Sequence, residues 1–332
     1  MKKIINSTEE IVNEMLDGIV KAHPEHVKRV EGTSVLKRVN SPIQGKVALI
    51  SGGGSGHEPS HAGFVGKGML DAAVAGEVFT SPTPDQVFEA IKAVGSDAGV
   101  LLVIKNYSGD VMNFEMAAEM AEMEDIKVEK VIVNDDVAVE NSTYTTGRRG
   151  VAGTIFVHKI AGAAAEEGRS LEEVQKIAQK VVDNTRTMGM SLGACTVPAV
   201  GKPSFTLAED EIEMGLGIHG EPGTHKEKIS SADELTEYML GKIIQDMPIE
   251  KGEEVGVIVN GLGATPLMEL YIVNRKLHSL LEEKEIKINK TLIGNYMTSL
   301  EMPGFSISVI KLDEELKGLL NAKADTPAFK EI

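Results

Sequence analysis

Short apolar runs alternate with segments of helical periodicity along the first half of the chain. Runs rich in Val, Ile and Leu at 46–51, 98–106 and 128–134 predict short buried strands. Helical spacing of apolar residues predicts helices over 83–95 and 110–125. Such alternation is typical of a largely parallel sheet covered by helices.

The second half repeats this alternation after a helical region. Helix is predicted over 151–184, and the Gly/Pro-rich stretch "MGMSLGACTVPAVGKPSF" follows it. A strand at 253–260, a turn "GLGATP" and a long helix at 266–285 then echo the strand, glycine loop and helix expected over 46–75. We therefore predict an α/β fold of two α/β domains, 1–185 and 186–332, with mostly parallel or mixed sheets flanked by helices.

Composition limits the number of domains, the partners and the location that we expect for this protein. A chain of 332 residues exceeds the usual size of a single core, which favours two domains. Its net charge of -16 disfavours nucleic acid and anionic membranes as partners, although acidity also simply maintains solubility. The single cysteine, Cys195, fits a reducing cytoplasm. The N-terminus resembles no signal peptide, and no apolar run approaches the roughly 18 residues of a membrane span.

The stretch "GGGSGHEPSH" (52–61) directly follows a predicted strand, and "IKNYSGD" (104–110) includes the end of the next. Because ligands of parallel sheets gather beyond the carboxyl ends of the strands, we expect both stretches to face one crevice. Glycines let backbone N–H groups approach a ligand oxygen, but glycines alone equally fit a tight turn. His57 and Glu58 at the end of this loop favour a binding site.

These glycine loops do not predict a nucleotide site. No G-x-x-x-x-G-K-[ST] sequence occurs, so a standard P-loop is absent. "GLGIHG" (215–220) matches G-x-G-x-x-G, but the charged segment "AEDEIEMG" precedes it instead of a buried strand. We expect this chain to bind no cofactor of its own.

Histidines in glycine-rich loops are the leading candidates for chemistry. His219 in "GIHGEPGTH" (217–225) belongs to no helical or strand pattern. It could act as a nucleophile or general base, or could merely hold the loop by hydrogen bonds. A metal site at His57, Glu58 and His61 is disfavoured, because Pro59 breaks helical spacing and no H-E-x-x-H is present. No metal site is expected.

Two further residues in "IKNYSGD" could take part. Asp110 stands where a helix N-cap is expected, and the helix dipole would keep such a carboxylate ionised. Lys105 could form a Schiff base with a carbonyl substrate, or could be a lysine at a strand end that pairs with an acid.

Six stretches together resemble the dihydroxyacetone kinase K subunit family, and the likeness covers essentially the whole chain. The most specific stretches are "GGGSGHEP", "GRRGVAGT" and "GLGIHGEPG". The others are "GEVFTSPTPDQVFEA", "GVLLVIKNYSGDVMNFE" and "LGATPLMELY". The resemblance implies two α/β domains in a homodimer.

The resemblance also implies roles for individual residues. His219 would bind dihydroxyacetone covalently as a hemiaminal, with His57 and Asp110 as acid/base groups. Gly54, Ser55, Gly56 and Lys105 fall where the family contacts substrate, together with His57 and Asp110. A tether that requires a carbonyl would reject glycerol, which has none.

The family occurs in two designs, and this chain resembles the stand-alone one. ATP-dependent members carry a fused nucleotide-binding domain, whereas this sequence ends at "TPAFKEI". The resemblance therefore implies a subunit of a phosphoenolpyruvate-dependent dihydroxyacetone phosphotransferase. A separate L subunit would hold ADP or ATP with Mg, and a phosphohistidine M subunit would recharge it. Two alternatives remain: a K-like coactivator that senses dihydroxyacetone for a transcription regulator, and an aldolase-type enzyme using a Lys105 Schiff base.

Overall fold

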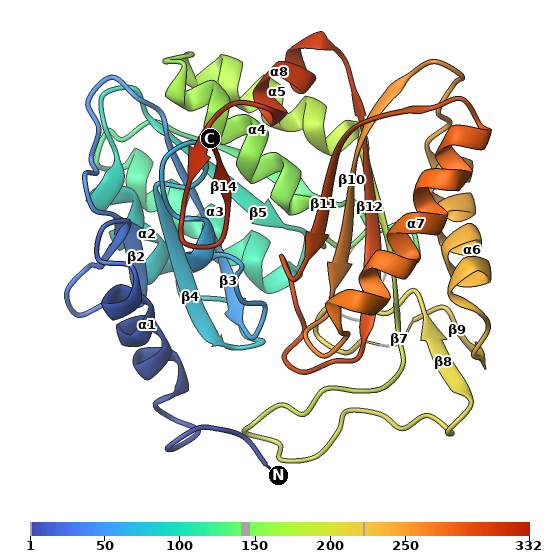
Figure 1. The fold of residues 1–332 in the computed structure, drawn as a ribbon. Helices are drawn as coiled ribbons and strands as arrows, with labels where there is room; N and C mark the ends of the chain where they lie inside the picture. Colours follow the sequence, from blue (N-terminus) through green and yellow to red (C-terminus); the bar gives the residue numbers. More distant parts are fainter. Residues whose placement is uncertain (1, 141–146, 222) are drawn as a thin grey trace.

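The computed structural model describes residues 2–140, 147–221 and 223–332, in which two six-stranded sheets lie side by side (Figure 1). The first sheet has the order β1-β2-β4-β3-β5-β6. Its strands are β1 (Val27–Arg29), β2 (Val35–Arg38), β3 (Ala48–Ser55), β4 (Ala72–Val78), β5 (Val100–Lys105) and β6 (Val128–Val133). β4, β3, β5 and β6 are parallel to one another, so this part of the sheet is parallel as predicted.

The second sheet has the order β11-β10-β12-β7-β8-β9 and is mostly antiparallel. Its strands are β7 (Thr185–Ser191), β8 (Glu211–Met214), β9 (His225–Lys228), β10 (Glu254–Gly261), β11 (Lys287–Gly294) and β12 (Gly304–Leu312). Only β10 and β11, which the helix α7 (Leu267–Glu283) connects, pair in parallel. The predicted α/β fold with mixed sheets flanked by helices is confirmed.

Helices cover both faces of the first sheet. α2 (Pro84–Val94) and α3 (Ser108–Glu122) pack on the face formed by Ile50, Leu102 and Ile104. α1 (Ile11–Ala22), α4 (Thr154–Glu166) and α5 (Leu171–Asp183) pack on the opposite face. The helical region expected over 151–184 is thus two helices, and the capping box of Ser170 and Glu173 begins the second.

The helix α4 lies between the two sheets (Figure 1). Every residue from Thr154 to Ala165 is buried. Its apolar cluster includes Leu101 from the first sheet and Ile258 and Ile310 from the second. α6 (Ala232–Asp246) and α7 cover the other face of the second sheet. A helix that is apolar all round needs such burial on all sides.

The chain finishes against its first half. After α8 (Glu314–Leu320), the short strands β13 (Ala324–Asp325) and β14 (Lys330–Glu331) lie beside the loop before β4. The Asp325 N–H donates to the carbonyl oxygen of Lys67 at 2.9 Å, and the Ala328 N–H donates to that of Gly63 at 2.8 Å. The division at 185/186 stays a prediction.

The helix predicted within 62–75 is wrong. This segment contains a single 3₁₀ turn, η1 (Ala62–Phe64), and then the central strand β4. The run "AAVAG" has no polar face, so periodicity cannot distinguish a buried strand from a buried helix. The preceding glycines make the difference: a Cβ at Gly66 would lie 2.3 Å from the carbonyl oxygen of Asp325. The tail of the chain therefore occupies the space that helix side chains would need.

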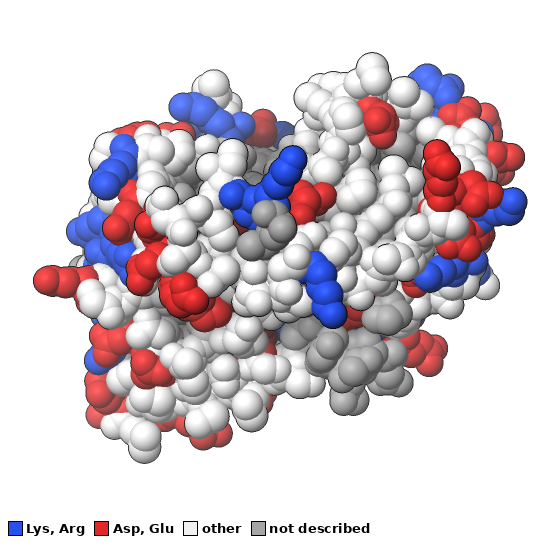
Figure 2. Space-filling model, turned by 90° about the horizontal axis from the view of Figure 1, so that it is seen from below, with Lys and Arg blue, Asp and Glu red and all other residues white. Residues whose placement is uncertain are grey.

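Charged side chains are spread over the surface. On the face drawn in Figure 2, acidic and basic side chains intermingle toward the left and right ends, and a few Lys and Arg side chains lie near the middle. Within the described part of the chain, no helix has the length and apolarity needed to cross a bilayer.

Because α4 is buried between the two sheets, we expect a Gly→Ala change in this helix to destabilise the protein, although the same change usually stabilises a helix. A Cβ at Gly162 would lie 2.5 Å from the Cα of Met69 and 2.6 Å from the carbonyl oxygen of Gly68. Gly162→Ala should therefore lower the free energy of unfolding by about 1–3 kcal/mol. At Gly241 in α6 a Cβ meets nothing within 4 Å, so Gly241→Ala should instead raise it by up to about 1 kcal/mol. Urea unfolding of both variants measures the difference; equal stabilities would contradict this packing.

Candidate active site

The carboxyl ends of β3 and β5 meet at one edge of the first sheet, as predicted. A pocket opens there, lined by Gly54 from the end of β3 and by Tyr107 and Asp110 from the residues after β5. His219 closes it from the loop after β8 in the second half of the chain. The remaining lining residues are Phe79, Thr80, Ser81, Ser108, Gly109 and Asn113. The two glycine-containing stretches therefore face one crevice.

A contact between two histidines joins the halves of the molecule at this pocket. The Nε2 atoms of His57 and His219 lie 3.0 Å apart, and their rings are nearly perpendicular, at 75°. The His57 Nδ1 lies 2.7 Å from the carbonyl oxygen of Thr298 in the second half. A carbonyl can only accept, so the His57 Nδ1 carries a proton and donates it. In its neutral form His57 then has an unprotonated Nε2 facing His219.

These contacts also determine which histidine carries the proton between the two Nε2 atoms. Burial, followed by the charges of His219 and Lys105, holds the pKa of His57 well below its usual range. His57 is therefore neutral, and the proton between the two Nε2 atoms belongs to His219. His57 is the natural acceptor when His219 must lose that proton.

The other nitrogen of His219 faces a buried carboxylate. Glu221 accepts from the His219 backbone N–H at 2.9 Å, and its Oε1 lies 3.2 Å from Nδ1. Burial raises the pKa of Glu221, but the hydrogen bond and charge of His219, with the charge of Arg149, outweigh it and lower this pKa to about 2. An ionised Glu221 keeps the proton on Nδ1, so Nε2 is the nitrogen of His219 that can react once its own proton has passed to His57.

Glycine makes this loop geometry possible at Gly217. A Cβ there would lie 2.1 Å from the Glu221 Oε2 and 2.6 Å from the Arg149 Nη1. Arg149 is fully buried, pairs with Asp136 at 2.7 Å and donates to the carbonyl oxygen of Gly215. Gly217 of "GLGIHG" therefore makes room for a buried carboxylate.

Two aromatic rings enclose the histidine pair. Phe79 stacks on His57 with centroids 5.2 Å apart at 15°, and its edge meets His219. Tyr107 meets His219 edge-on, with centroids 4.5 Å apart at 88°. These rings shield the imidazoles from part of the solvent, which strengthens the electrostatic interactions between them.

Asp110 lines the same pocket, but it is not the N-cap that the sequence predicted. α3 begins at Ser108 after the N-cap residue Tyr107, so Asp110 lies inside the first turn. The extended residue Tyr107 is the N-cap, so the helix has already begun before the glycine at 109 and continues through it. The side chain is thereby freed from capping and accepts from the Ser81 hydroxyl and from Lys105 at 3.3 Å. A carboxylate in a first turn is still stabilised by the helix dipole.

Lys105 is completely buried beneath this carboxylate. Its Nζ donates to the carbonyl oxygen of Gly52 at 3.2 Å and lies 3.3 Å from the His61 Nε2. His61 in turn contacts the His158 Nε2 at 2.9 Å. A Cβ at Gly53 would lie 2.4 Å from the lysine Nζ, so this glycine covers the amine tightly. Such enclosure disfavours a Schiff base at Lys105 and favours pairing with an acid.

Four residues that the sequence singled out remain: Gly54, Ser55, Gly56 and Glu58. Gly54 lines the pocket, whereas Ser55 is buried and donates to the carbonyl oxygen of Gly76 at 2.7 Å. Gly56 has a φ of 104°, and a Cβ there would meet Phe79 at 2.9 Å. Glu58 accepts from the Gly56 N–H instead of pointing to the histidines.

Sequence reasoning missed several residues that shape this site. Residues 141–146 of "VNDDVAVENSTYTTGRRGVAGT" and Pro222 of "GIHGEPG" lie outside the described residues. Glu221, in that same motif, was missed although a carboxylate two residues from a histidine is a recognisable signal. Four further residues carry no such signal, because only folding brings them to His57, His219 and Asp110. They are Phe79, Ser81, Tyr107 and Thr298.

Comparison with known proteins gives a consistent picture. The Dak1 domain family matches residues 17–328. The chain is 56% identical over 330 residues to a Listeria innocua protein named PTS-dependent dihydroxyacetone kinase 1, dihydroxyacetone-binding subunit DhaK; the match covers 99% of this chain and 100% of that one.

Two solved structures share the fold. The dihydroxyacetone kinase of C. freundii in complex with AMP-PNP and Mg2+ superposes with a TM-score of 0.91 at 36% identity, covering 99% of this chain and 61% of that one. The dihydroxyacetone kinase operon co-activator Dha-DhaQ superposes with a TM-score of 0.91 at 36% identity, covering 98% and 99%. Matches of this extent and identity leave one assignment: the chain belongs to the Dak1 domain family.

Proposed function

We propose that this chain is the dihydroxyacetone-binding subunit of a phosphoenolpyruvate-dependent dihydroxyacetone kinase. The observation that carries the proposal is that His219 and Asp110 line one pocket while the buried His57 contacts His219, which supplies a nucleophile, its proton acceptor and a base. The 56% identity to a dihydroxyacetone-binding subunit over the whole chain supports the same substrate.

Binding begins at the His219 Nε2. The Nε2 proton first passes to the His57 Nε2, 3.0 Å away, and the lone pair that this leaves on the His219 Nε2 then bonds to the carbonyl carbon of dihydroxyacetone. The carbonyl π electrons move to oxygen, and His57 returns the proton there, which gives a hemiaminal hydroxyl and restores neutral His57. Glu221 holds the proton on Nδ1 and balances the positive charge of the alkylated ring. Atoms and charge are conserved in this step.

The tether holds the small substrate in place for phosphoryl transfer. A terminal hydroxyl must lose its proton as it attacks, and Asp110 is the ionisable carboxylate that lines the pocket. Lys105 and Ser81 orient this carboxylate from beneath and beside it. Gly54 lines the wall where the substrate lies, with the buried Ser55 and Gly56 next to it in the chain, and no metal is assigned to this pocket.

The phosphoryl donor belongs to a partner in this proposal. ATP with Mg would be held by a separate ADP-binding L subunit and recharged by a phosphohistidine M subunit. The Mg2+ and AMP-PNP named for the C. freundii kinase, which is longer than this chain, support a nucleotide site outside the region that matches. The single cysteine fits a cytoplasmic protein. Exposed Leu267, Met268 and Tyr271 on α7 support a homodimer.

A coactivator that senses dihydroxyacetone is the second candidate. The similarity to the co-activator Dha-DhaQ covers nearly the full length of both chains, which favours it specifically. A sensor requires the His219 tether but not the proton transfer at Asp110. The two functions therefore differ in the need for Asp110.

Reconstitution tests the proposed kinase function. The chain with ATP alone should form no dihydroxyacetone phosphate. Addition of an ADP-loaded L subunit and a phosphohistidine M donor should start product formation, measured by a coupled dehydrogenase assay. No product from the full mixture, with dihydroxyacetone binding intact, would contradict the kinase and favour the sensor.

His219→Ala should weaken dihydroxyacetone binding at least tenfold, because the covalent bond is lost. Native mass spectrometry measures the same change: the wild type should gain the mass of one bound triose, and the variant should not. His225→Ala is the matched control, since His225 is exposed on β9 six residues away and should leave binding unchanged. Equal binding by the His219→Ala variant and the wild type would refute the tether.

Asp110→Asn should separate binding from chemistry. The amide keeps the shape of the side chain but cannot take a proton, so turnover should fall by about 10²–10⁴-fold. Dihydroxyacetone affinity should change far less, as calorimetry would measure. Glu115→Gln is the matched control, because it makes the same carboxylate-to-amide change in α3 at a side chain outside the pocket. Full turnover by the Asp110→Asn variant would remove Asp110 from the role of base.

A further inference from the structure

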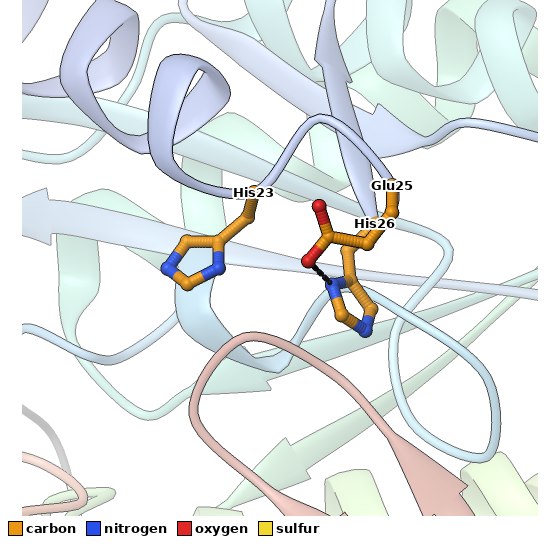
Figure 3. Close-up of side chains that lie close together, drawn as sticks. All are labelled: His23, Glu25 and His26. Atoms are coloured by element: carbon orange, nitrogen blue, oxygen red, sulfur yellow. Dashed lines mark hydrogen bonds and ion pairs between the residues drawn. The ribbon is translucent and has the colours of Figure 1, made fainter.

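A second group of ligand-type side chains lies outside this pocket, in the turn between α1 and β1. His23, Glu25 and His26 each offer one ligand atom, and these atoms all lie within 4.8 Å of one another. Figure 3 shows the Glu25 carboxylate between the two imidazole rings.

The backbone of this turn holds the three residues close together. The N–H groups of His26 and Val27 both donate to the carbonyl oxygen of His23, at 3.0 and 3.1 Å. The carbonyl oxygen of His26 accepts from the Val39 N–H at 3.0 Å, which ties the turn to the residue after β2. Ligands presented by a hydrogen-bonded turn need little reorganisation to bind an ion.

The partners of His26 leave a place for a cation. Its Nε2 lies 3.3 Å from the Asp325 Oδ1 in the C-terminal tail, and its Nδ1 lies 3.0 Å from the Glu25 Oε1. A neutral ring can donate to only one of these carboxylates. With the proton on Nε2, an unprotonated Nδ1 faces a carboxylate oxygen, and both are electron donors. A proton or a metal ion between them removes this repulsion.

From these contacts we propose that His23, Glu25 and His26 bind a divalent first-row transition-metal ion such as Zn2+. Two imidazoles and one carboxylate are typical zinc ligands, and water can complete the tetrahedron. Ligand atoms of such a site lie roughly 3.3 Å apart, close to the Glu25–His26 separation of 3.0 Å. The third ligand atom, from His23, lies within 4.8 Å of the other two.

Asp325 supplies the outer contact that metal-bound histidines usually have. A ligating imidazole commonly donates its other N–H to a carboxylate, which fixes the tautomer and strengthens the ligand. The His26 Nε2–Asp325 contact has this arrangement and would connect the ion to the C-terminal tail. Mg2+ and Ca2+ prefer oxygen ligands and should not bind here.

Zn2+ titration of the full chain at pH 7.5, followed by competition with a chromophoric chelator, tests the site. The wild type should bind one more equivalent of Zn2+ than the His23→Ala or His26→Ala variant, which excludes a contribution from the buried His57–His219 pair. Glu25→Gln, which keeps the side-chain shape, should weaken this equivalent at least tenfold. Asp325→Asn should weaken it by about 10–100-fold.

His225→Ala is the matched control. His225 is also exposed, and its Nε2 lies 3.3 Å from Glu227, but this pair lacks a second histidine. This variant should retain the full Zn2+ stoichiometry. Indistinguishable titrations of the wild type and of folded His26→Ala and Glu25→Gln variants would overturn the proposal, as would equal binding of Mg2+.

Discussion

The contact between His57 and His219 is the constraint on which the site depends. The two imidazoles come from different halves of the chain and lie 3.0 Å apart at Nε2. This geometry requires that His57 be neutral with its proton on Nδ1, which the Thr298 carbonyl secures. A small shift between the two sheets would separate the nucleophile from its proton acceptor. The packing of α4 between the sheets therefore supports chemistry that occurs far from its own side chains.

The surroundings of this pair keep each charge in a defined place. Glu221 and Arg149 lie buried under the loop of His219, and Asp110 and Lys105 lie buried under the opposite wall. Each carboxylate has a nearby cation that offsets the cost of burying its charge. Phe79 and Tyr107 pack on the imidazoles between these charged groups. The pocket thereby presents a nucleophile and a base in one water-poor space, which suits the proposed tether and phosphoryl transfer.

Much of the fold was accessible from the sequence because its signals are local. The strands β3, β5, β6 and β10 each contain a short run of apolar residues, and the surface helices α2 and α7 have clear periodicity. The segment 62–75 was predicted wrongly because an apolar run without a polar face fits either structure. The N-cap at Asp110 was wrong because the helix begins three residues earlier, at an N-cap residue that makes no side-chain cap.

The sequence by itself determined the α/β class and the two glycine-containing stretches, because strand ends and glycines are encoded residue by residue. Its motifs also singled out His57, Asp110 and His219 as candidates. Only the tertiary structure decided that His57 faces His219, that Thr298 sets its tautomer, and that the tail beyond α8 lies beside His26. The physical reason is that hydrogen-bond partners are set by distances in space. These pairs are separated by 162 to 299 residues, and no local pattern encodes such contacts.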